Sequence, residues 1–293
     1  MKLKAIYIIP ALLCLLFSCT ARIDISTKAG KEHLVIYGYL TDELGYHYIK
    51  ITRSTGYFAT EAPEGVSGAD VKISTPTTVI HLYEYEPKSG MYIMERMYQG
   101  IEGEEYTLDV SLDFNNDGEM ERYTASSQLP FAARVDSIDV QKSDALNHRV
   151  EVLLYGQLPD SDENHFIFQI SRNNQSLDDS LSKFSLISDK YLTEKVINRL
   201  PVYFLDQEEE EEKLYKGDIL ELKVKTITKE YYTFLSDAQD EVWGKIPIFS
   251  GPPANIKTNI TQVEGENEIP LVGFFTAYSG DAKSVLVQED YGE

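Results

Sequence analysis

The sequence predicts a mainly β protein made of antiparallel sandwiches, and three observations lead to that class. Apolar and polar residues alternate with a period of two in many short segments, which is the pattern of half-buried strands. Turn-rich stretches such as 62–65, 86–90 and 115–118 separate these segments. With 293 residues, 42% of them hydrophobic, the chain can bury a sizeable core without disulfides. Many short strands with such punctuation favour sandwiches over α/β architectures.

The first nineteen residues have the features of a bacterial lipoprotein signal. A short basic start precedes the apolar run 5–17, which is too short to span a bilayer but fits a signal-peptide core. The run ends in Leu-Phe-Ser-Cys, which resembles a lipobox whose cysteine receives lipid. We therefore predict a signal peptide over 1–18, lipidation of Cys19 and a lipidated tether over 19–32. The alternative is an ordinary signal peptide that happens to contain a cysteine.

The positions of the cysteines and the apolar runs indicate where in the cell the mature chain is expected. Cys14 falls inside the segment that would be removed, and Cys19 would be acylated, so the exported chain keeps no thiol for a disulfide. No other apolar run is long enough to cross a membrane, so we expect an anchored protein. Thr20 follows the cysteine where an aspartate would signal inner-membrane retention. We therefore expect a lipid anchor in the outer membrane, at the cell surface rather than the periplasmic face.

The charge excludes two classes of partner. The formal net charge is −21, from 27 Lys+Arg against 48 Asp+Glu. Nucleic acids and anionic lipid surfaces are both bound through clustered basic residues. We therefore expect no nucleic-acid partner and no docking on a membrane through a basic patch.

Each predicted strand is an alternating or a β-branched and aromatic segment bounded by turn residues. In order, the predicted strands are 33–40, 47–53, 69–74, 78–85, 91–96, 105–112, 120–126, 135–141, 149–154, 165–171, 200–205, 220–226, 271–277 and 284–288. The alternation is clearest in 105–112 and 220–226, where apolar and polar residues change at every step. One short helix is predicted near 228–240, because its apolar residues recur at helical spacing. A shorter helical or irregular piece is expected near 189–198.

Two β-rich domains are predicted, with a boundary near Leu129-Pro130. Residues 33–130 form the N-terminal β-sandwich, whose order of strands and turns resembles immunoglobulin-like or transthyretin-like modules. Residues 131–293 form a second β-rich, sandwich-like domain that carries the helix. The alternative is that the two halves pack as one body.

One loop has the spacing of the first half of a calcium site. The candidate ligands are Asp113, Asn115, Asp117, Glu119 and Glu121. The twelfth position is Thr124 instead of a bidentate glutamate, and the flanks read as strands, so the loop is not an EF-hand. Two interpretations stay open: a looser calcium site in a hairpin, or a hairpin whose Asn-Asp-Gly favours positive φ. No other cofactor is expected.

A second candidate surface follows the predicted helix. The prolines between 246 and 261 favour an ordered loop or an extended edge, because proline cannot donate within a central strand. The candidate interface residues are Trp243, Pro252, Pro253 and Asn255. For Trp243, packing of the helix against the sheet is an equally good interpretation.

Other conspicuous residues have ordinary explanations. The run Glu208–Glu212 is interpreted as a solvated hairpin tip instead of a cation site. None of the five histidines stands in a metal-ligand pair such as H-x-x-x-H. Tyrosine is abundant, with 20 residues, and alternate pairs such as Tyr37/Tyr39 are interpreted as same-face packing in the core. Neither a G-x-S-x-G elbow nor a phosphate-binding loop is present.

Several segments in order resemble a family of Bacteroidota lipoproteins, domain of unknown function 4249. Residues 33–43 resemble its opening strand, which ends in a glycine, two hydrophobic residues, threonine and aspartate. The other similar segments are 46–53, 68–73, 229–235, 252–260 and 272–275. The resemblance covers nearly all of the mature chain. It implies an accessory lipoprotein of a TonB-dependent outer-membrane transporter, and it implies no catalytic residues.

Together, these features predict a non-catalytic binding partner of a TonB-dependent transporter, acting in nutrient capture or uptake with an unidentified ligand. A structural or adhesive cell-surface lipoprotein is the first alternative. A hydrolase acting on an extracellular polymer is a weaker one, because sequence alone cannot pair two carboxylates across a cleft.

Overall fold

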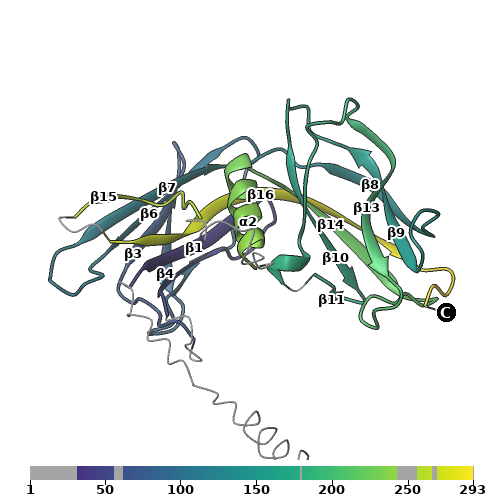
Figure 1. Cartoon of the computed structure of the whole chain (residues 1–293). Helices are drawn as coiled ribbons and strands as arrows, with labels where there is room; N and C mark the ends of the chain where they lie inside the picture. Colours follow the sequence, from purple (N-terminus) through teal and green to yellow (C-terminus); the bar gives the residue numbers. More distant parts are fainter. Residues whose placement is uncertain (1–31, 56–61, 179, 243–255, 266–268, 293) are drawn as a thin grey trace, which may run out of the picture. The chain divides into compact units, whose positions relative to one another are not determined.

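The computed structural model describes residues 32–292, except 56–61, 179, 243–255 and 266–268 (Figure 1). The predicted signal peptide and Cys19 therefore lie outside the described residues. The same holds for the candidate interface residues Trp243, Pro252, Pro253 and Asn255. From Glu32 onward, the chain forms one compact unit.

The prediction of a mainly β, sandwich-forming protein is confirmed. The strands are β1 (Leu34–Thr41), β2 (Tyr48–Arg53), β3 (Asp70–Ser74), β4 (Val79–Glu84), β5 (Met91–Met94), β6 (Glu105–Leu112), β7 (Glu121–Gln128), β8 (Arg134–Lys142), β9 (Arg149–Gln157), β10 (His165–Arg172), β11 (Gln175–Ser176), β12 (Ser185–Ser188), β13 (Val196–Asp206), β14 (Ile219–Ile227), β15 (Thr261–Glu264) and β16 (Leu271–Leu286). A 3₁₀ turn, η1 (Leu181–Lys183), and one α-helix, α2 (Lys229–Val242), complete the described elements. Each predicted strand overlaps an observed one, whereas β11, β12 and β15 were not predicted.

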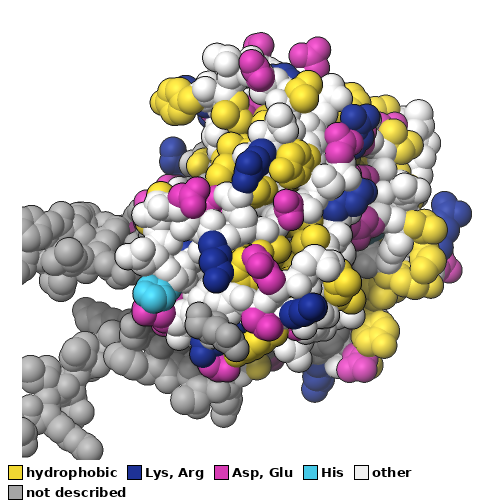
Figure 2. All heavy atoms as spheres, turned by 90° about the vertical axis from the view of Figure 1, so that its right-hand side faces the viewer, with side chains coloured by type: hydrophobic (Ala, Val, Ile, Leu, Met, Phe, Trp, Pro, Cys, Tyr) yellow, Lys and Arg dark blue, Asp and Glu magenta, His cyan; other side chains and the backbone are white. Residues whose placement is uncertain are grey.

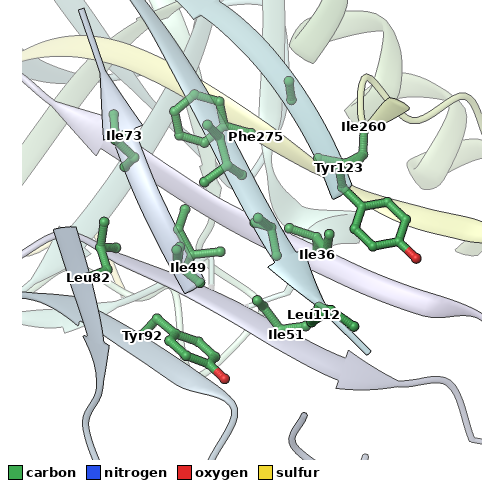
Figure 3. Packing of buried hydrophobic residues seen from close by; sticks show 14 of the residues in the cluster. Ile36, Ile49, Ile51, Ile73, Leu82, Tyr92, Leu112, Tyr123, Ile260 and Phe275 are labelled. Carbon is green, nitrogen blue, oxygen red and sulfur yellow. The ribbon is translucent and has the colours of Figure 1, made fainter. Parts of the chain in front are cut away.

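The N-terminal half is a sheet that folds back on itself around one core. Its strands follow the order β1-β2-β5-β4-β3-β6-β7-β15. Ile36 and Ile49 point inward from neighbouring strands and meet Tyr123 and Phe275 from other parts of the sheet (Figure 3). The backbone N–H of Ala277 in β16 donates to Ser127 Oγ in β7, 2.9 Å away, which brings distant members of the sheet together. This half is therefore sandwich-like, as expected.

Strand β16 connects the two halves. Its first part pairs in parallel with β1, and its second part pairs antiparallel with β14. The sequence predicted two strands here, 271–277 and 284–288, but the pairing with β14 continues through Ser279 and Asp281, so one strand spans sixteen residues. Gly273 has φ +105°, and a Cβ there would lie 2.0 Å from the carbonyl oxygen of Ile36, so only glycine fits.

The C-terminal half is a second sandwich. A three-stranded sheet in the order β13-β9-β8 packs on β10, β14 and β16. Alternation sets the two sides of β10: Phe166 and Phe168 enter the core between the sheets, whereas Ile167 faces the other way. Helix α2 covers this outer side through Tyr231 and Leu235, so the predicted helix is confirmed (Figure 1). Among the described residues, no helix is long and apolar enough to cross a membrane.

Near the predicted domain boundary, the chain passes from the first hydrophobic core to the second. The first core includes Leu129, and the second begins with Ala133. However, Ile260 and Phe275 pack in the first core, although the sequence placed them in the second domain. The chain thus returns to the N-terminal half before it ends in the C-terminal one, because β16 pairs with both β1 and β14.

Tyr37 and Tyr39, interpreted as core residues, face away from the first core instead, and the hydroxyl of Tyr37 lies 3.0 Å from that of Tyr231 in α2. Tyr37 and Tyr39 alternate with Ile36 and Leu40, and the branched aliphatic residues take the core side of β1. Further along the same sheet face, Tyr83 is 56% exposed. Alternation shows that two tyrosines share a face but does not show which face is buried.

Charged side chains are interspersed on the end of the molecule that β8, β9 and β13 form. Figure 2 shows acidic and basic side chains side by side on this end, with hydrophobic ones between them. No field of a single sign therefore covers it.

The glutamate run 208–212 is an ordered crossover instead of a hairpin tip. It follows β13 and precedes β14, which belong to different sheets. Lys213 Nζ lies 2.6 Å from Glu210 Oε2, and the backbone N–H of Asp206 donates to Glu212 Oε2 at 2.7 Å. These local partners therefore hold a segment in which the sequence alone predicts repulsion between neighbouring glutamates.

A candidate ligand-binding cleft beside helix α2

A cleft of about 370 Å³ opens where the two halves meet beside the first turn of α2. Glu105 of β6 and Gln128 of β7 line it from the N-terminal half. His165 of β10 and Lys229 of α2 line it from the C-terminal half. Four elements, β6, β7, β10 and α2, therefore contribute polar side chains to one cleft.

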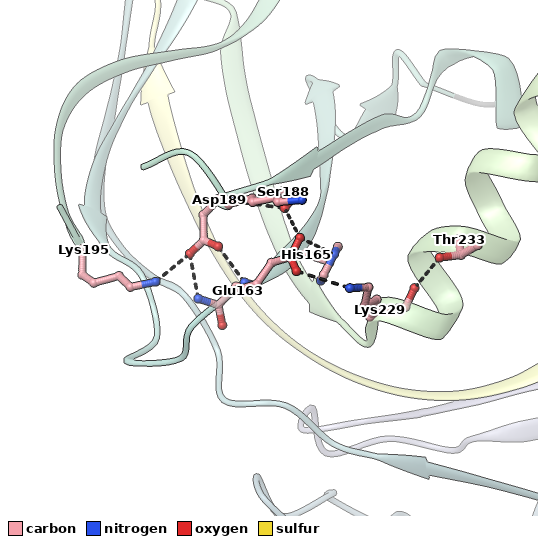
Figure 4. A network of polar contacts seen from close by, with 9 residues as sticks. Glu163, His165, Ser188, Asp189, Lys195, Lys229 and Thr233 are labelled. Atoms are coloured by element: carbon pink, nitrogen blue, oxygen red, sulfur yellow. Dashed lines mark hydrogen bonds and ion pairs between the residues drawn. The ribbon is translucent and has the colours of Figure 1, made fainter. Parts of the chain in front are cut away.

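A carboxylate bridge organises the C-terminal wall of the cleft (Figure 4). Glu163 Oε1 accepts a hydrogen bond from Ser188 Oγ at 3.1 Å, and Lys229 Nζ donates to Glu163 Oε2 at 3.4 Å. Burial alone would raise the pKa of Glu163, but the bonds from Ser188 and Lys229 outweigh it and lower the pKa. Glu163 is therefore ionised and ties the strand end at β12 to the start of α2.

His165 is buried in the same wall. Its ring lies 4.8 Å from the ring of Tyr232, and its Nε2 lies 3.5 Å from Glu163 Oε1. Burial lowers the pKa of His165, while the charge of Glu163 opposes this shift and that of Lys229 adds to it. The imidazole is therefore neutral at pH 7. Ser188 Oγ donates to Glu163 and not to His165, so these groups are not arranged as a nucleophile with its base.

A second carboxylate supports the wall from behind. Asp189 is 1% exposed and accepts hydrogen bonds from the backbone N–H of Asn164 at 2.6 Å and from its Nδ2 at 2.7 Å. Lys195 Nζ lies 3.0 Å from Asp189 Oδ2. Burial alone would raise the pKa of Asp189, but Asn164 and Lys195 together lower it. This fixed pair holds Asn164 at the edge of the cleft.

The cleft continues into a more apolar pocket of about 340 Å³. The two share Lys229, Glu230, Asn259 and Phe274, and the second adds Phe234. The rings of Phe234 and Phe274 lie 4.9 Å apart. A ligand seated here would meet hydrogen-bonding groups at one end and aromatic surface at the other, which is the usual chemistry of small-molecule sites.

The structure gathers only part of the predicted calcium loop. Asp113 accepts from the backbone N–H groups of Asp117, at 3.1 Å, and Gly118, at 2.9 Å. Asn115 Nδ2 donates to Asp117 Oδ2 at 2.8 Å, whereas Glu121 is buried and accepts from the backbone N–H of Phe114 at 2.9 Å. Glu119 is exposed. In the described part of the chain, no group of three or more His, Cys, Asp or Glu side chains is placed to hold a metal ion. Calcium binding stays a prediction.

Substituting Asp113 by alanine should lower the free energy of unfolding by about 1 kcal/mol, the usual effect of losing a side-chain acceptor for backbone N–H groups. Thermal melts of wild type and variant measure this. The same melts with added calcium test the metal. If calcium binds, it should raise the melting temperature of the wild type and leave that of Asp113→Ala unchanged. No calcium effect on either protein would contradict the predicted site.

Sequence reasoning missed the cleft. His165 was placed on a strand, but nothing in its neighbourhood indicated that Lys229 or Gln128 lies beside it. The only local signal is that Glu163, Asn164 and His165 precede or begin an otherwise apolar strand. The contacts that make the site join residues up to 133 positions apart, as in the hydrogen bond from Asn259 Nδ2 to the carbonyl oxygen of Ser126.

Among curated proteins, none matches the chain. The family described as "Domain of unknown function (DUF4249)" matches residues 20–284, which is most of the chain and includes every wall of the cleft. The chain therefore belongs to the DUF4249 family.

Proposed function

We propose that this chain is a non-catalytic binding lipoprotein, held at the outer membrane by a lipid on Cys19 and exposed at the cell surface. In this proposal it is the accessory partner of a TonB-dependent transporter and captures a nutrient for it. The leader that ends in Cys19 and the resemblance described above support the location and the partner.

The observation that carries the binding role is the cleft beside α2. In its C-terminal wall, Glu163 is paired with Lys229, and behind this wall Asp189 is paired with Lys195, so this part of the cleft is polar but locally compensated. Such a wall favours recognition through hydrogen bonds over strong attraction of an ion. The adjoining aromatic surface of Phe234 and Phe274 would hold the apolar part of the ligand.

A fixed wall also suits capture of a ligand. Asp189 and Glu163 each have at least two polar partners, so their side chains are held before any ligand arrives. Preorganisation lowers the cost of binding, because fewer side chains must be ordered in the complex.

Copurification tests the transporter partner. The chain would carry a C-terminal tag in its native organism, and membranes would be extracted gently. We expect a β-barrel transporter in near-stoichiometric amount. The matched control is Cys19→Ser. This variant should no longer be found in the membrane fraction, and the β-barrel transporter should no longer copurify with it. Recovery of the lipidated chain alone under several detergents would contradict the transporter role and favour the adhesive alternative.

A further inference from the structure

A second surface on the same unit has its own chemistry. Four neighbouring strands, in the order β14-β16-β1-β2, turn one face away from both sandwich cores. Tyr39 and Tyr48 stand opposite each other on this face, in the register of β1 and β2. Tyr278 of β16 and Lys225 of β14 continue it. These four residues are named the tyrosine face below.

The rings of the tyrosine face form one connected set. The ring centroids of Tyr39 and Tyr48 are 5.3 Å apart, and those of Tyr39 and Tyr278 are 5.5 Å apart. All three tyrosines are partly exposed. They therefore offer ring surface, together with hydroxyl groups, to a molecule that arrives from solvent.

Lys225 lies at one end of this set without a carboxylate partner. Its Nζ sits 5.0 Å from the centroid of the Tyr278 ring. Within the described residues, Lys225 takes part in no ion pair, whereas its neighbour Lys223 pairs with Glu43. Burial, helped by the charge of nearby Lys223, lowers the pKa of Lys225 to about 8, although Asp178 and Glu43 act against this shift.

Asp178 and Glu43 act on the half-buried ammonium of Lys225 without forming an ion pair with it, and the ring of Tyr278 offsets only part of the cost of its burial. An anion placed beside Lys225 would supply a direct ion pair. In a chain with 48 acidic and 27 basic side chains, a lysine that lies over the ring of Tyr278 and forms no ion pair among the described residues is a local exception. Charge complementarity therefore favours an anionic ligand here, and screening confines the repulsion by distant carboxylates.

We propose that the tyrosine face binds a ligand in which a ring with an apolar face carries a carboxylate. The carboxylate pairs with Lys225, and the ring packs on Tyr278, Tyr39 and Tyr48. Sugar acids and aromatic acids share this chemistry. The site is separate from the cleft beside α2, and it does not depend on the transporter role proposed above.

Isothermal titration of the mature lipidated chain in detergent tests the proposal. The probes are 4-hydroxybenzoate and trigalacturonate, with 4-hydroxybenzamide and galactotriose as their uncharged counterparts. At least one acid should bind about tenfold more tightly than its uncharged counterpart, as expected for a charge-assisted pair. Binding of one acid alone identifies whether the ring is aromatic or a sugar.

The variants locate the site. Lys225→Met keeps the length and apolar packing of the side chain and should weaken acid binding about tenfold or more. Lys72→Met, on β3 and also half-buried, is the matched control and should bind like the wild type. Tyr48→Leu should weaken both acids and their uncharged counterparts, because it removes ring surface. Circular dichroism checks that each variant is folded.

Two results would overturn the proposal. One is the absence of binding of either acid at millimolar concentration to the folded wild type. The other is equal acid binding by wild type and Lys225→Met, which would place the carboxylate elsewhere. Failure of the transporter to copurify would not alter either of these binding results, so the two proposals can be contradicted independently.

Discussion

Replacing Phe275 by alanine is expected to lower the free energy of unfolding by about 3–5 kcal/mol. Phe275 is 0% exposed and sits on β16, where this strand pairs with β1. Its ring fills the first core together with Ile36 and Tyr123 (Figure 3). The cavity left behind cannot collapse easily, because the backbone N–H of Phe275 is held by Asn259 Oδ1 at 3.0 Å. Denaturant unfolding measures the change.

Phe131→Ala is the matched control, because Phe131 is 58% exposed and the substitution is chemically identical. It should change the free energy of unfolding by less than about 1 kcal/mol. A difference of similar size in both variants would mean that the core is not organised around β16 as described. A broadened or two-step transition in Phe275→Ala would instead show that the halves unfold separately.

Replacing Asp189 by alanine is the second substitution with a large expected effect, about 3–5 kcal/mol at pH 7. The change leaves Lys195 without its carboxylate and removes the acceptor of the Asn164 backbone N–H and one of the two acceptors of its Nδ2. Removing one partner of a buried pair costs more than the pair contributes, because the remaining groups stay desolvated. Denaturant unfolding again gives the magnitude. Asp160→Ala, an exposed aspartate nearby, is the control and should be close to neutral.

The effect of Asp189→Ala should depend on pH with a definite sign. The pKa of Asp189 is lower in the folded protein than in the unfolded chain. Its stabilising contribution is therefore complete above the unfolded value, about 3.9, and is lost as the pH falls through the folded value. The difference between wild type and variant should stay constant from pH 7 to pH 5 and shrink below pH 4. A difference that shrinks already between pH 7 and pH 6 would assign the effect to another group.

Much of the fold could be predicted from local pattern. The period of two in 105–112 and 220–226 gave strands that the structure confirms as β6 and β14, because alternation is a property of a single strand. The helical spacing of Tyr231 and Leu235 likewise predicted α2. The short strand β12 was missed, because its residues Ser185–Ser188 show no alternation in burial and are fixed only by pairing with β10.

The candidate cleft was not predictable in the same way. Glu163, Asn164 and His165 are contiguous, but the partners that give them their chemistry are Ser188, Asp189, Lys195 and Lys229. These partners come from three separate places: the end of β12, the residue before β13 and the start of α2. A pattern of hydrophobic residues says which side of a strand is buried, but it contains no information about which strand ends meet.

The sequence by itself determined the class of fold, the position of the helix, the family and the features expected of the leader, because these depend on residues close together in the chain. Only the tertiary structure decided that β16 is one strand shared by two sandwiches, that Tyr37 and Tyr39 face away from the core, and that a cleft forms beside α2. These outcomes follow from the pairing of β16 with β1 on one side and β14 on the other. Strand pairing is set by the burial of whole faces against each other, a long-range condition that no single segment carries.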